Sequence, residues 1–239
     1  MLVGISLAGG VNSPIEVYAD DQEEYIYATL SPVTPIQYES FSSEQALRDR
    51  AWKLDGRYGG QCVTFVNTFL GTQWTEEFHG YAGSIKPNID YPKVGYAVLF
   101  NNHAAVIVDI QGSDLVLAES NYEGHETVSV GRIVSISDPS LRGYYSFEKY
   151  YIIALSNEYS VDTQKALWVS YCESKFWRFA DNPSSTALGT MQHLNSLWPS
   201  RLRYLGLDPS LDILSPHDNA LVGMMLVAKD GWRHWEQCL

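Results

Sequence analysis

A change of apolar periodicity near residue 96 constrains the fold of this chain most strongly. Before it, apolar residues recur at helical spacing over 44–54 and again from Cys62 onward. After it, short β-rich runs are separated by turn residues at the close spacing of an antiparallel sheet. These runs are 97–100, 104–110, 115–118, 127–130 and 144–147. Helices followed by a meander of neighbouring strands predict an α+β domain over 45–157.

Residues 158–239 predict a second domain that is small and mainly α-helical. Asp162 is a suitable N-cap, and an apolar stripe follows it at helical spacing. The stripe consists of Ala166, Val169, Cys172 and Phe176. The remaining segment, 1–44, contains a strand-like run at 25–28 and a proline-bounded linker at 31–35. Its sequence indicates no function.

The acidic charge of the chain is concentrated near its N-terminal end. The net charge is −12, and residues 1–47 contain seven acidic side chains but no Lys or Arg. This balance argues against nucleic acid as a partner, because nucleic-acid binding needs clustered positive charge. No apolar run approaches the roughly 20 residues that a membrane-spanning helix needs. Residues 1–8 are apolar but carry no positive charge, so we do not expect a cleaved signal peptide.

Cys62 lies where a helix is predicted to begin. Gly59 and Gly60 interrupt the chain just before it, and the apolar series starts at the cysteine itself. Free backbone N–H groups and the helix dipole favour a thiolate at this position. A lone cysteine on an apolar helix is more commonly a core residue, however, so further residues must support a catalytic role.

His103 and Glu119 supply that support. A cysteine, a histidine and a polar residue that orients the histidine form the nucleophilic site of cysteine hydrolases. A three-residue loop at 112–114 would pair the two strands so that His103, Glu119 and Asn121 share one face. A two-residue loop would place Glu119 and Asn121 on the opposite face from His103, unless a bulge intervened. We therefore expect the three-residue loop.

The motifs around these residues resemble the CHAP family of cysteine, histidine-dependent amidohydrolases/peptidases, which belongs to the NlpC/P60-like group. They are Gly60-Gln-Cys-Val-Thr-Phe-Val66, Val94-Gly-Tyr-Ala-Val-Leu-Phe100 with His103-Ala-Ala-Val-Ile-Val108, and Ala118-Glu-Ser-Asn121. The resemblance implies a papain-like fold, with N-terminal helices packed on an antiparallel sheet. Tyr96 departs from the family pattern, which commonly has Asp there, and we interpret it as a structural variation.

The resemblance also implies roles for the matched residues. Cys62 would attack an amide carbonyl, and His103 would take the thiol proton and pass it to the leaving amine. Glu119 would orient the imidazole, and Asn121 would assist it or help to polarise the site. Gln61 is a candidate oxyanion donor. His79 and His125 have no such context, and we expect both at the surface.

Glu173 is the candidate catalytic residue of the C-terminal domain. It lies beside the apolar stripe, where burial would raise the pKa of its carboxyl toward that of a general acid. A glutamate on an amphipathic helix is usually exposed, so the flanking motifs decide its interpretation. Cys172-Glu-Ser-Lys-Phe176, Asn182-Pro-Ser-Ser-Thr-Ala-Leu-Gly-Thr-Met-Gln192 and Asp218-Asn219 resemble the lysozyme-like transglycosylase (SLT) family.

This second resemblance implies that Glu173 protonates a glycosidic oxygen and that Met191 and Gln192 line the sugar-binding cleft. No second carboxylate is evident; Asp181, Asp208 and Asp212 are candidates by residue type alone. The number of cysteines, three, allows either reduced thiols or one disulfide. A Trp-rich C-terminus ending in Cys occurs in some members of the family, and it implies a Cys172–Cys238 disulfide with Cys62 free. Such a disulfide implies an oxidising location.

Together the resemblances lead us to expect a bifunctional peptidoglycan-degrading enzyme, a phage lysin or virion-associated tail lysin. It would cut peptide or amide bonds with Cys62 and glycan strands with Glu173, as a lytic transglycosylase or a muramidase. The expected partners are bacterial peptidoglycan and other phage tail or virion proteins, and the expected location is extracellular or on the virion.

Three alternatives remain: a secreted bacterial wall-remodelling hydrolase, a virion structural protein that binds the cell wall, and a protein with one active site and one binding domain. We expect no cofactor. Calcium is a minor alternative, through the acidic run Asp20-Asp21-Gln-Glu-Glu24.

Overall fold

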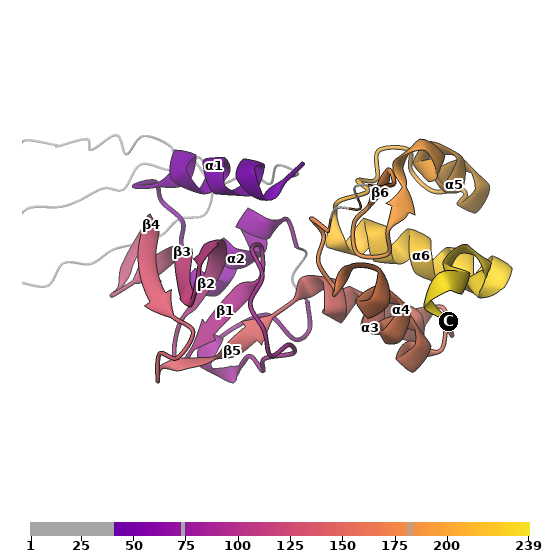
Figure 1. The fold of residues 1–239 in the computed structure, drawn as a ribbon. Coiled ribbons are helices and arrows are strands. Elements are labelled where there is room, and N and C mark those ends of the chain that lie inside the picture. The colour runs from indigo at the N-terminus through magenta and orange to yellow at the C-terminus, as the bar shows by residue number, and fades with distance from the viewer. Residues whose placement is uncertain (1–40, 73–74, 181, 183) are drawn as a thin grey trace, which may run out of the picture. The chain divides into compact units, whose positions relative to one another are not determined.

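A five-stranded antiparallel sheet forms the core of the N-terminal half of the described chain (Figure 1). The computed structural model describes residues 41–239 except 73–74, 181 and 183. The strand-like run at 25–28, the linker at 31–35 and the acidic run at 20–24 lie outside the described residues. The sheet has the order β4-β3-β2-β1-β5. Its strands are β1 (Ala97–Phe100), β2 (Ala104–Gln111), β3 (Asp114–Tyr122), β4 (His125–Ser135) and β5 (Leu141–Tyr145).

The α+β class and the antiparallel pairing are confirmed, but the last strand differs from the prediction. β1 to β4 form a meander, whereas β5 returns to pair with β1 on the other side of the sheet. β3 and β4 are longer than the predicted runs, and β5 ends at Tyr145 because Ser146 caps a helix. The edge strands of the sheet are therefore β4 and β5.

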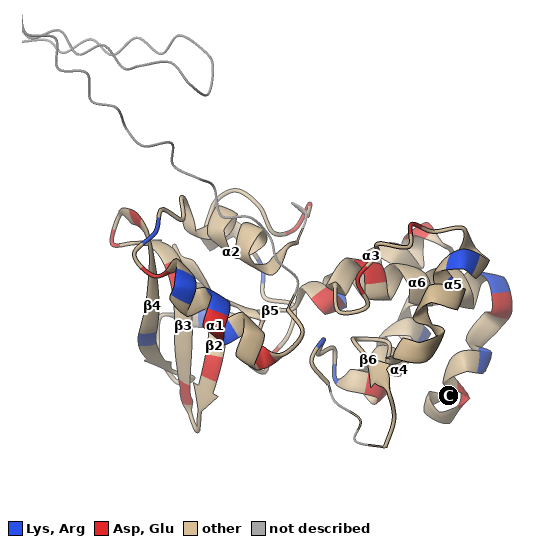
Figure 2. Cartoon of the chain, turned by 90° about the horizontal axis from the view of Figure 1, so that it is seen from above, with Lys and Arg blue, Asp and Glu red and all other residues tan. Residues whose placement is uncertain are grey.

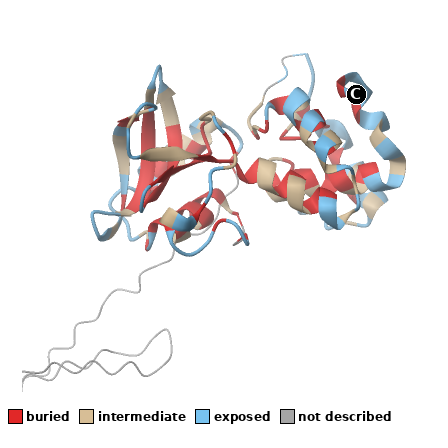
Figure 3. Cartoon of the chain, turned by 90° about the horizontal axis from the view of Figure 1, so that it is seen from below, coloured by how far each residue is buried: buried red, intermediate tan, exposed pale blue. Residues whose placement is uncertain are grey.

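Two helices pack on the sheet and place Cys62 against it. They are α1 (Glu44–Leu54) and α2 (Cys62–Leu70), both close to their predicted positions. Along β2, Ala104 and Val106 lie in the cluster that includes the buried side of α2, whereas Ala105 and Ile107 belong to a second cluster. From Ala104 to Val108 both faces of β2 are buried, and this part of the strand is a continuous apolar run (Figure 3).

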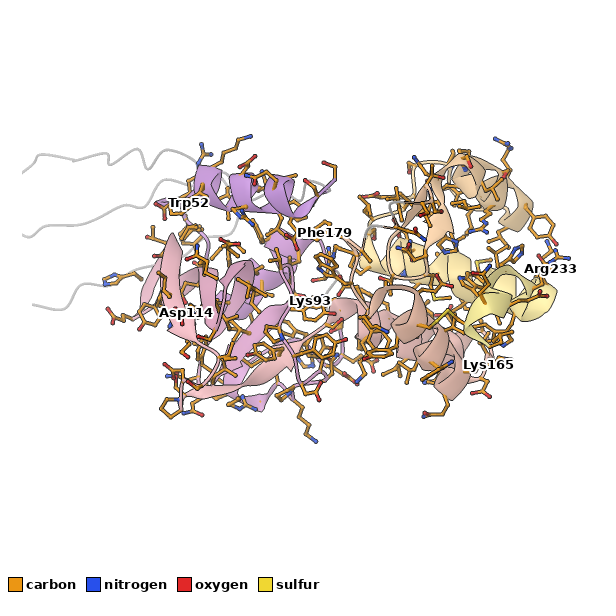
Figure 4. All side chains as sticks on the ribbon, viewed as in Figure 1. Trp52, Lys93, Asp114, Lys165, Phe179 and Arg233 are labelled. Carbon is orange, nitrogen blue, oxygen red and sulfur yellow. A yellow bond between two sulfur atoms is a disulfide. The ribbon has the colours of Figure 1, made fainter. Side chains whose placement is uncertain are left out.

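α1 is fixed to the sheet by an ion pair and an indole. Arg48 binds Asp109 of β2 at 3.0 Å, and the helix carries acidic and basic side chains side by side (Figure 2). Trp52 lies over β4, where a Cβ on Gly131 would come within 3.1 Å of the indole (Figure 4). Gly131 has a φ of 101°, which also favours glycine.

The hairpin between β2 and β3 has a two-residue loop, so the expected three-residue loop is wrong. Gln111 pairs with Asp114, and Gly112 takes a φ of 66° in the turn. The pairing then shifts between Ile107 and Asp109, which leaves Val108 as the extra residue of a β-bulge. Beyond the bulge Val106 pairs with Ala118, and continuing this register puts His103 and Glu119 on one face. The bulge shifts the alternation of side chains by one residue, so His103 and Glu119 share a face despite the two-residue loop.

The C-terminal half is mainly helical, as predicted, with one small two-stranded sheet. α3 was not predicted; it contacts α4 and α6, so helical packing begins before the predicted boundary at 157/158. Asp162 caps α4 as expected, accepting from the backbone N–H of Lys165 at 3.0 Å. The main elements are α3 (Phe147–Glu158), α4 (Thr163–Ser174), β6 (Ala187–Leu188), β7 (His193–Leu194), α5 (Trp198–Leu205) and α6 (Pro216–Asp230). The short 3₁₀ helices are η1 (Ala82–Ser84), η2 (Asn195–Leu197) and η3 (Gly231–Cys238).

Tyr96 joins the sheet to the end of α4. Its ring is fully buried, and its hydroxyl donates to the carbonyl of Phe176 at 3.0 Å and to that of Lys175 at 3.3 Å. Lys175 and Phe176 both adopt positive φ, which costs free energy unless neighbouring contacts hold it. The side chain that departs from the CHAP pattern therefore has a structural role, consistent with its interpretation as a structural variation.

Candidate active site

Cys62 is the first residue of α2, and the turn before it is bound to β3. Ser120 donates to the carbonyl of Gly60 at 2.7 Å, and both residues are buried. A Cβ at Gly59 would lie 2.5 Å from the Ser120 hydroxyl oxygen, so only glycine fits there. Gly60 takes a φ of 69°, which glycine also favours. The two glycines that interrupt the sequence therefore let the turn approach β3 and place the thiol beside the sheet.

Cys62, His103 and Glu119 form one series of interacting side chains. His103 lowers the pKa of the Cys62 thiol, and Nε2 of its ring lies 2.9 Å from Oε2 of Glu119. With Nε2 engaged by Glu119, Nδ1 is the ring nitrogen left for the thiol. Glu119 is fully buried, whereas Cys62 and His103 retain 9% and 7% of their exposure. The carboxylate is thus the most strongly shielded from water of the three groups.

The electrostatics around Cys62 and His103 favour a thiolate paired with an imidazolium. Burial opposes a thiolate, but hydrogen bonds from His103 and from the backbone N–H of Ala104 prevail and lower the pKa of Cys62. Burial likewise opposes an imidazolium, yet contacts with Cys62 and Glu119 raise the pKa of His103. The thiolate and the imidazolium therefore stabilise each other, as a cysteine nucleophile requires.

Arg132 on β4 completes the surroundings of Glu119. Its Nε and Nη2 donate to the two carboxylate oxygens at 2.6 and 2.7 Å. Burial opposes the carboxylate, but hydrogen bonds from His103 and Arg132 lower the pKa of Glu119. Glu119 is thus held as an anion between two cationic groups.

Asn121 and Gln61 bond to each other, and neither has a hydrogen bond to His103 among the described residues. The side chain of Asn121 donates to Oε1 of Gln61 at 2.7 Å, and its backbone has a φ of 59° at an irregularity of β3. The Gln61 amide donates to Glu126, which also accepts from Tyr58 at 3.0 Å. The structure therefore gives Asn121 contact with Gln61 in place of the expected contact with the imidazole. One hydrogen of the Gln61 amide is left for an oxyanion.

Glu173 lies on the last turn of α4, half-buried next to a disulfide. Cys172 and Cys238 are bonded to each other, so Cys62 is the only free cysteine, and all three lie in the described residues. Oε1 of Glu173 is 3.3 Å from Sγ of Cys238. A disulfide sulfur carries no proton, so a hydrogen bond here requires a protonated carboxyl. Burial raises the pKa of Glu173, and no cation within the described residues offsets it.

The residues expected to line the sugar cleft are used internally. Met191 is fully buried: its sulfur accepts from Ser170 at 2.9 Å and its carbonyl accepts from Trp235 at 2.8 Å. The Met191 side chain belongs to the core, and its expected place in the wall of a sugar cleft stays a prediction. Gln192 is partly exposed, and its amide donates to the carbonyls of Ala180 and Gly189.

The described candidates for a second carboxylate bond to other groups. Asp208 accepts from Ser210, and Asp212 accepts from the backbone N–H of Leu214 at 2.9 Å. Asp181 lies outside the described residues.

His79 and His125 are exposed, as predicted. In the described ranges, no group of three or more His, Cys, Asp or Glu side chains is arranged to hold a metal ion. Nor does that part of the chain contain a helix long and apolar enough to cross a membrane.

Comparisons of the chain with protein-family models, with curated proteins and with solved structures found no match. The resemblance to the two families therefore rests on the motifs quoted above.

Sequence reasoning missed Arg132, Ser120 and Glu126. The predicted fourth strand covered only 127–130, whereas β4 extends to Ser135. In the observed register Arg132 pairs with Leu117, two residues from Glu119 on the same face. A longer predicted strand would have suggested an Arg–Glu pair. Ser120 needed the three-dimensional approach of Gly60, which no local pattern encodes.

Proposed function

We propose that the chain is a bifunctional peptidoglycan-degrading enzyme that cleaves amide bonds at Cys62 and glycan strands at Glu173. The observation that carries the proposal is the series Cys62–His103–Glu119, in which Glu119 lies 2.9 Å from the His103 ring and His103 lowers the pKa of the thiol. A buried ion-pair series of this kind has a defined chemical use, whereas a core cysteine has no need of it.

Amide cleavage at Cys62 follows from this geometry. The thiolate attacks the amide carbonyl carbon, and the carbonyl electron pair moves to oxygen to give a tetrahedral oxyanion. His103, as imidazolium, donates its proton to the leaving amine nitrogen, the C–N bond breaks, and a thioester remains. His103 then takes a proton from water, whose oxygen attacks the thioester and releases the acid. Glu119 keeps the ring oriented and stabilises its positive charge throughout.

The start of α2 provides groups that can stabilise the oxyanion. The first backbone N–H groups of a helix have no partner within the helix, and that of Cys62 lies next to the reacting sulfur. The free amide hydrogen of Gln61 is the second donor, because Asn121 and Glu126 hold the amide at both ends. Removing one such donor typically costs about 3–4 kcal/mol of transition-state stabilisation.

Glycan cleavage at Glu173 is supported by the environment of a single carboxyl. With a raised pKa and a sulfur as its nearest neighbour, this group is suited to donate a proton to a glycosidic oxygen. In the absence of a second carboxylate, the sugar's own 6-hydroxyl can close an anhydro product, as in lytic transglycosylases. A positioned water in place of that hydroxyl gives the muramidase outcome.

Peptidoglycan as the substrate follows from the two motif resemblances considered together. A mesh of glycan strands cross-linked by peptides offers an amide to one site and a glycoside to the other. The Cys172–Cys238 disulfide supports action outside the cytosol, as expected of a phage lysin, a tail lysin or a secreted wall hydrolase.

Digestion of purified cell walls by single variants tests this proposal. Cys62→Ala removes the nucleophile and Glu173→Gln removes the acid with little change of shape; Glu236→Gln, at an exposed glutamate in the same region, is the control. Mass spectrometry of the products should show loss of new amine ends with the first variant and loss of glycan fragments with the second. The double variant should release neither. If each single variant released both product classes, the bifunctional proposal would be wrong.

A narrower second function keeps only the Cys62 site active and uses the helical half to bind glycan. The observation in its favour is that Met191 is buried and the Gln192 amide is bonded to backbone carbonyls. It predicts that Glu173→Gln changes wall binding but none of the products, which the same digestion distinguishes.

A further inference from the structure

The buried carboxylate of Glu119 is bonded to two side chains. Its Oε2 lies 2.9 Å from Nε2 of His103, and Arg132 on the neighbouring strand donates to both of its oxygens. A fully buried carboxylate is costly unless it is paired and hydrogen-bonded. A bidentate guanidinium also fixes the plane of the carboxylate, which a single hydrogen bond does not. The orientation of Glu119 toward His103 therefore depends on Arg132.

Arg132 is itself packed against two aromatic rings. Its guanidinium carbon lies 4.4 Å from the centre of the Tyr122 ring and 4.9 Å from that of Phe100. Gly131 is the extra residue of a β-bulge, because Leu117 pairs with Arg132 and Ala118 pairs with Val130. Its φ is 101°, and the bulge sets the register that brings Arg132 onto the same face as Glu119. Phe100 and Tyr122 also contact the His103 ring, at 6.3 and 5.6 Å between centres. The same two rings thus pack against both the guanidinium and the imidazole.

We propose that Arg132 is a positioning residue of the Cys62 site, which holds Glu119 ionised and aimed at His103. This inference rests on the proposed role of Cys62 as a nucleophile. Among the described residues Arg132 makes no hydrogen bond to the thiol or to His103, so its charge reaches the imidazole through Glu119. The result is a series of alternating charges, from thiolate through imidazolium and carboxylate to guanidinium.

The charged and titratable groups around Glu119 define the expected pH dependence. His103 faces it from the start of β2 and Arg132 from β4, and Cys62 on α2 lies beyond His103. Tyr122 on β3 and Asp138 after β4 face Arg132. Removing the guanidinium raises the pKa of Glu119, so the carboxyl takes up a proton at a higher pH. A neutral Glu119 no longer supports the imidazolium, and the thiolate is then lost. Direct repulsion between Arg132 and the imidazolium is the weaker effect, because Glu119 lies between them.

The alternative is that Arg132 only stabilises the sheet. Arg48 provides a matched control, since it makes a part-buried ion pair with Asp109 in the same half of the chain, away from the thiol. A purely structural arginine should lower the melting temperature when it is replaced and leave the chemistry of Cys62 unchanged.

The test is the rate of Cys62 alkylation by iodoacetamide as a function of pH, measured on the full chain. Cys62 is the only free cysteine, so the modified mass reports this thiol alone. In Arg132→Met the midpoint of the acid limb should move up by about one pH unit or more, the usual effect of removing an opposite charge next to a carboxylate. Arg132→Lys, which keeps the charge but not the two-pronged contact, should move it less in the same direction. Arg48→Met should not move it.

Unchanged midpoints in both Arg132 variants, with lowered melting temperatures, would overturn the inference and leave Arg132 a structural residue. Should Arg132→Met fail to fold, the conservative Arg132→Lys decides by the direction of its shift. The wild-type profile separates this inference from the proposed function. If wild-type Cys62 were alkylated with the pH profile of an ordinary thiol, its proposed role as a nucleophile would be wrong. If the wild-type midpoint were lowered but did not change in the Arg132 variants, only the positioning role of Arg132 would be wrong.

Discussion

Glu119 and Glu173 are the same side chain in two opposite environments. Glu119 is fully buried but lies between His103 and Arg132, and these contacts lower its pKa despite the burial. Glu173 is only half-buried but lies beside a disulfide sulfur with no cation among the described residues, and its pKa is raised. The depth of burial therefore does not decide the protonation state. Compensation by neighbouring charges decides it, and it suits one glutamate to orient a base and the other to act as an acid.

His103→Ala should produce the largest effect, because His103 lowers the pKa of both Cys62 and Glu119. Without the imidazole the thiol loses the hydrogen bond that lowers its pKa, and Glu119 loses one of its two cationic partners. Amide cleavage should fall by about 10²–10⁴-fold, the usual contribution of a general base. Alkylation of Cys62 at neutral pH should also fall, by a smaller factor, because an ordinary thiol still has a few per cent thiolate at that pH. His79→Ala, at an exposed histidine, is the control. Near-wild-type alkylation in His103→Ala would show that the thiol does not depend on the ring.

The double substitution Cys172→Ser with Cys238→Ser tests Glu173, the glutamate whose burial is not offset by a cation among the described residues. The bond joins α4 to η3 across 66 positions of sequence, and its loss should cost about 2–5 kcal/mol in unfolding free energy. The packing that half-buries Glu173 would also loosen, so its pKa should move down toward the ordinary value. Chemical denaturation measures the first effect, and the pH profile of glycan cleavage measures the second. An alkaline limb of glycan cleavage that keeps its position would mean that the disulfide does not set this pKa.

Tyr96→Phe should affect the two sites unequally and by less. It removes the hydroxyl that donates to the carbonyls of Lys175 and Phe176, just after Glu173. We expect a loss of about 1–2 kcal/mol in stability, typical of leaving a buried acceptor with fewer partners. Glycan cleavage should decrease while alkylation of Cys62 stays unchanged. Tyr81→Phe, at a largely exposed tyrosine, is the control, and an equal effect of both substitutions would remove any special role of Tyr96.

Glu173→Gln should have the smallest effect on stability, and in the stabilising direction. A carboxyl whose pKa is raised in the folded state destabilises the fold once pH rises through that pKa, because its ionised form is disfavoured there. Glutamine removes this penalty at neutral pH, and the gain should vanish in acid, where Glu173 is protonated. Melting temperatures at the two pH values measure it. A gain that is larger in acid than at neutral pH would reverse the assigned sign.

The local parts of the Cys62 site could be predicted from the sequence, and its long-range parts could not. The start of α2 at Cys62 and the capping of α4 by Asp162 follow from glycines, apolar spacing and a capping side chain, all of which act within a few residues. The β2–β3 loop was predicted with the wrong length because a bulge at Val108 and a two-residue turn give the same alternation as a longer loop. Periodicity alone cannot separate these two arrangements.

The C-terminal site shows the same limit. Met191 occurs in a motif that the resemblance assigns to the sugar cleft, yet the packing of Ser170 and Trp235 around it puts its side chain in the core. Arg132 was missed because its importance arises only when β4 is long enough to lie beside Glu119. Both outcomes depend on contacts between residues far apart in sequence.

The most direct test of the contrast between the two glutamates is an NMR titration of their side-chain carboxyl carbons in the wild-type chain. Glu119→Gln and Glu173→Gln assign the two signals by their disappearance. The structure predicts that Glu119 remains ionised to a pH below the ordinary range for glutamate, and that Glu173 keeps its proton to a pH above it. Titration of both carboxyls together in the ordinary range, or in the reverse order, would contradict the account.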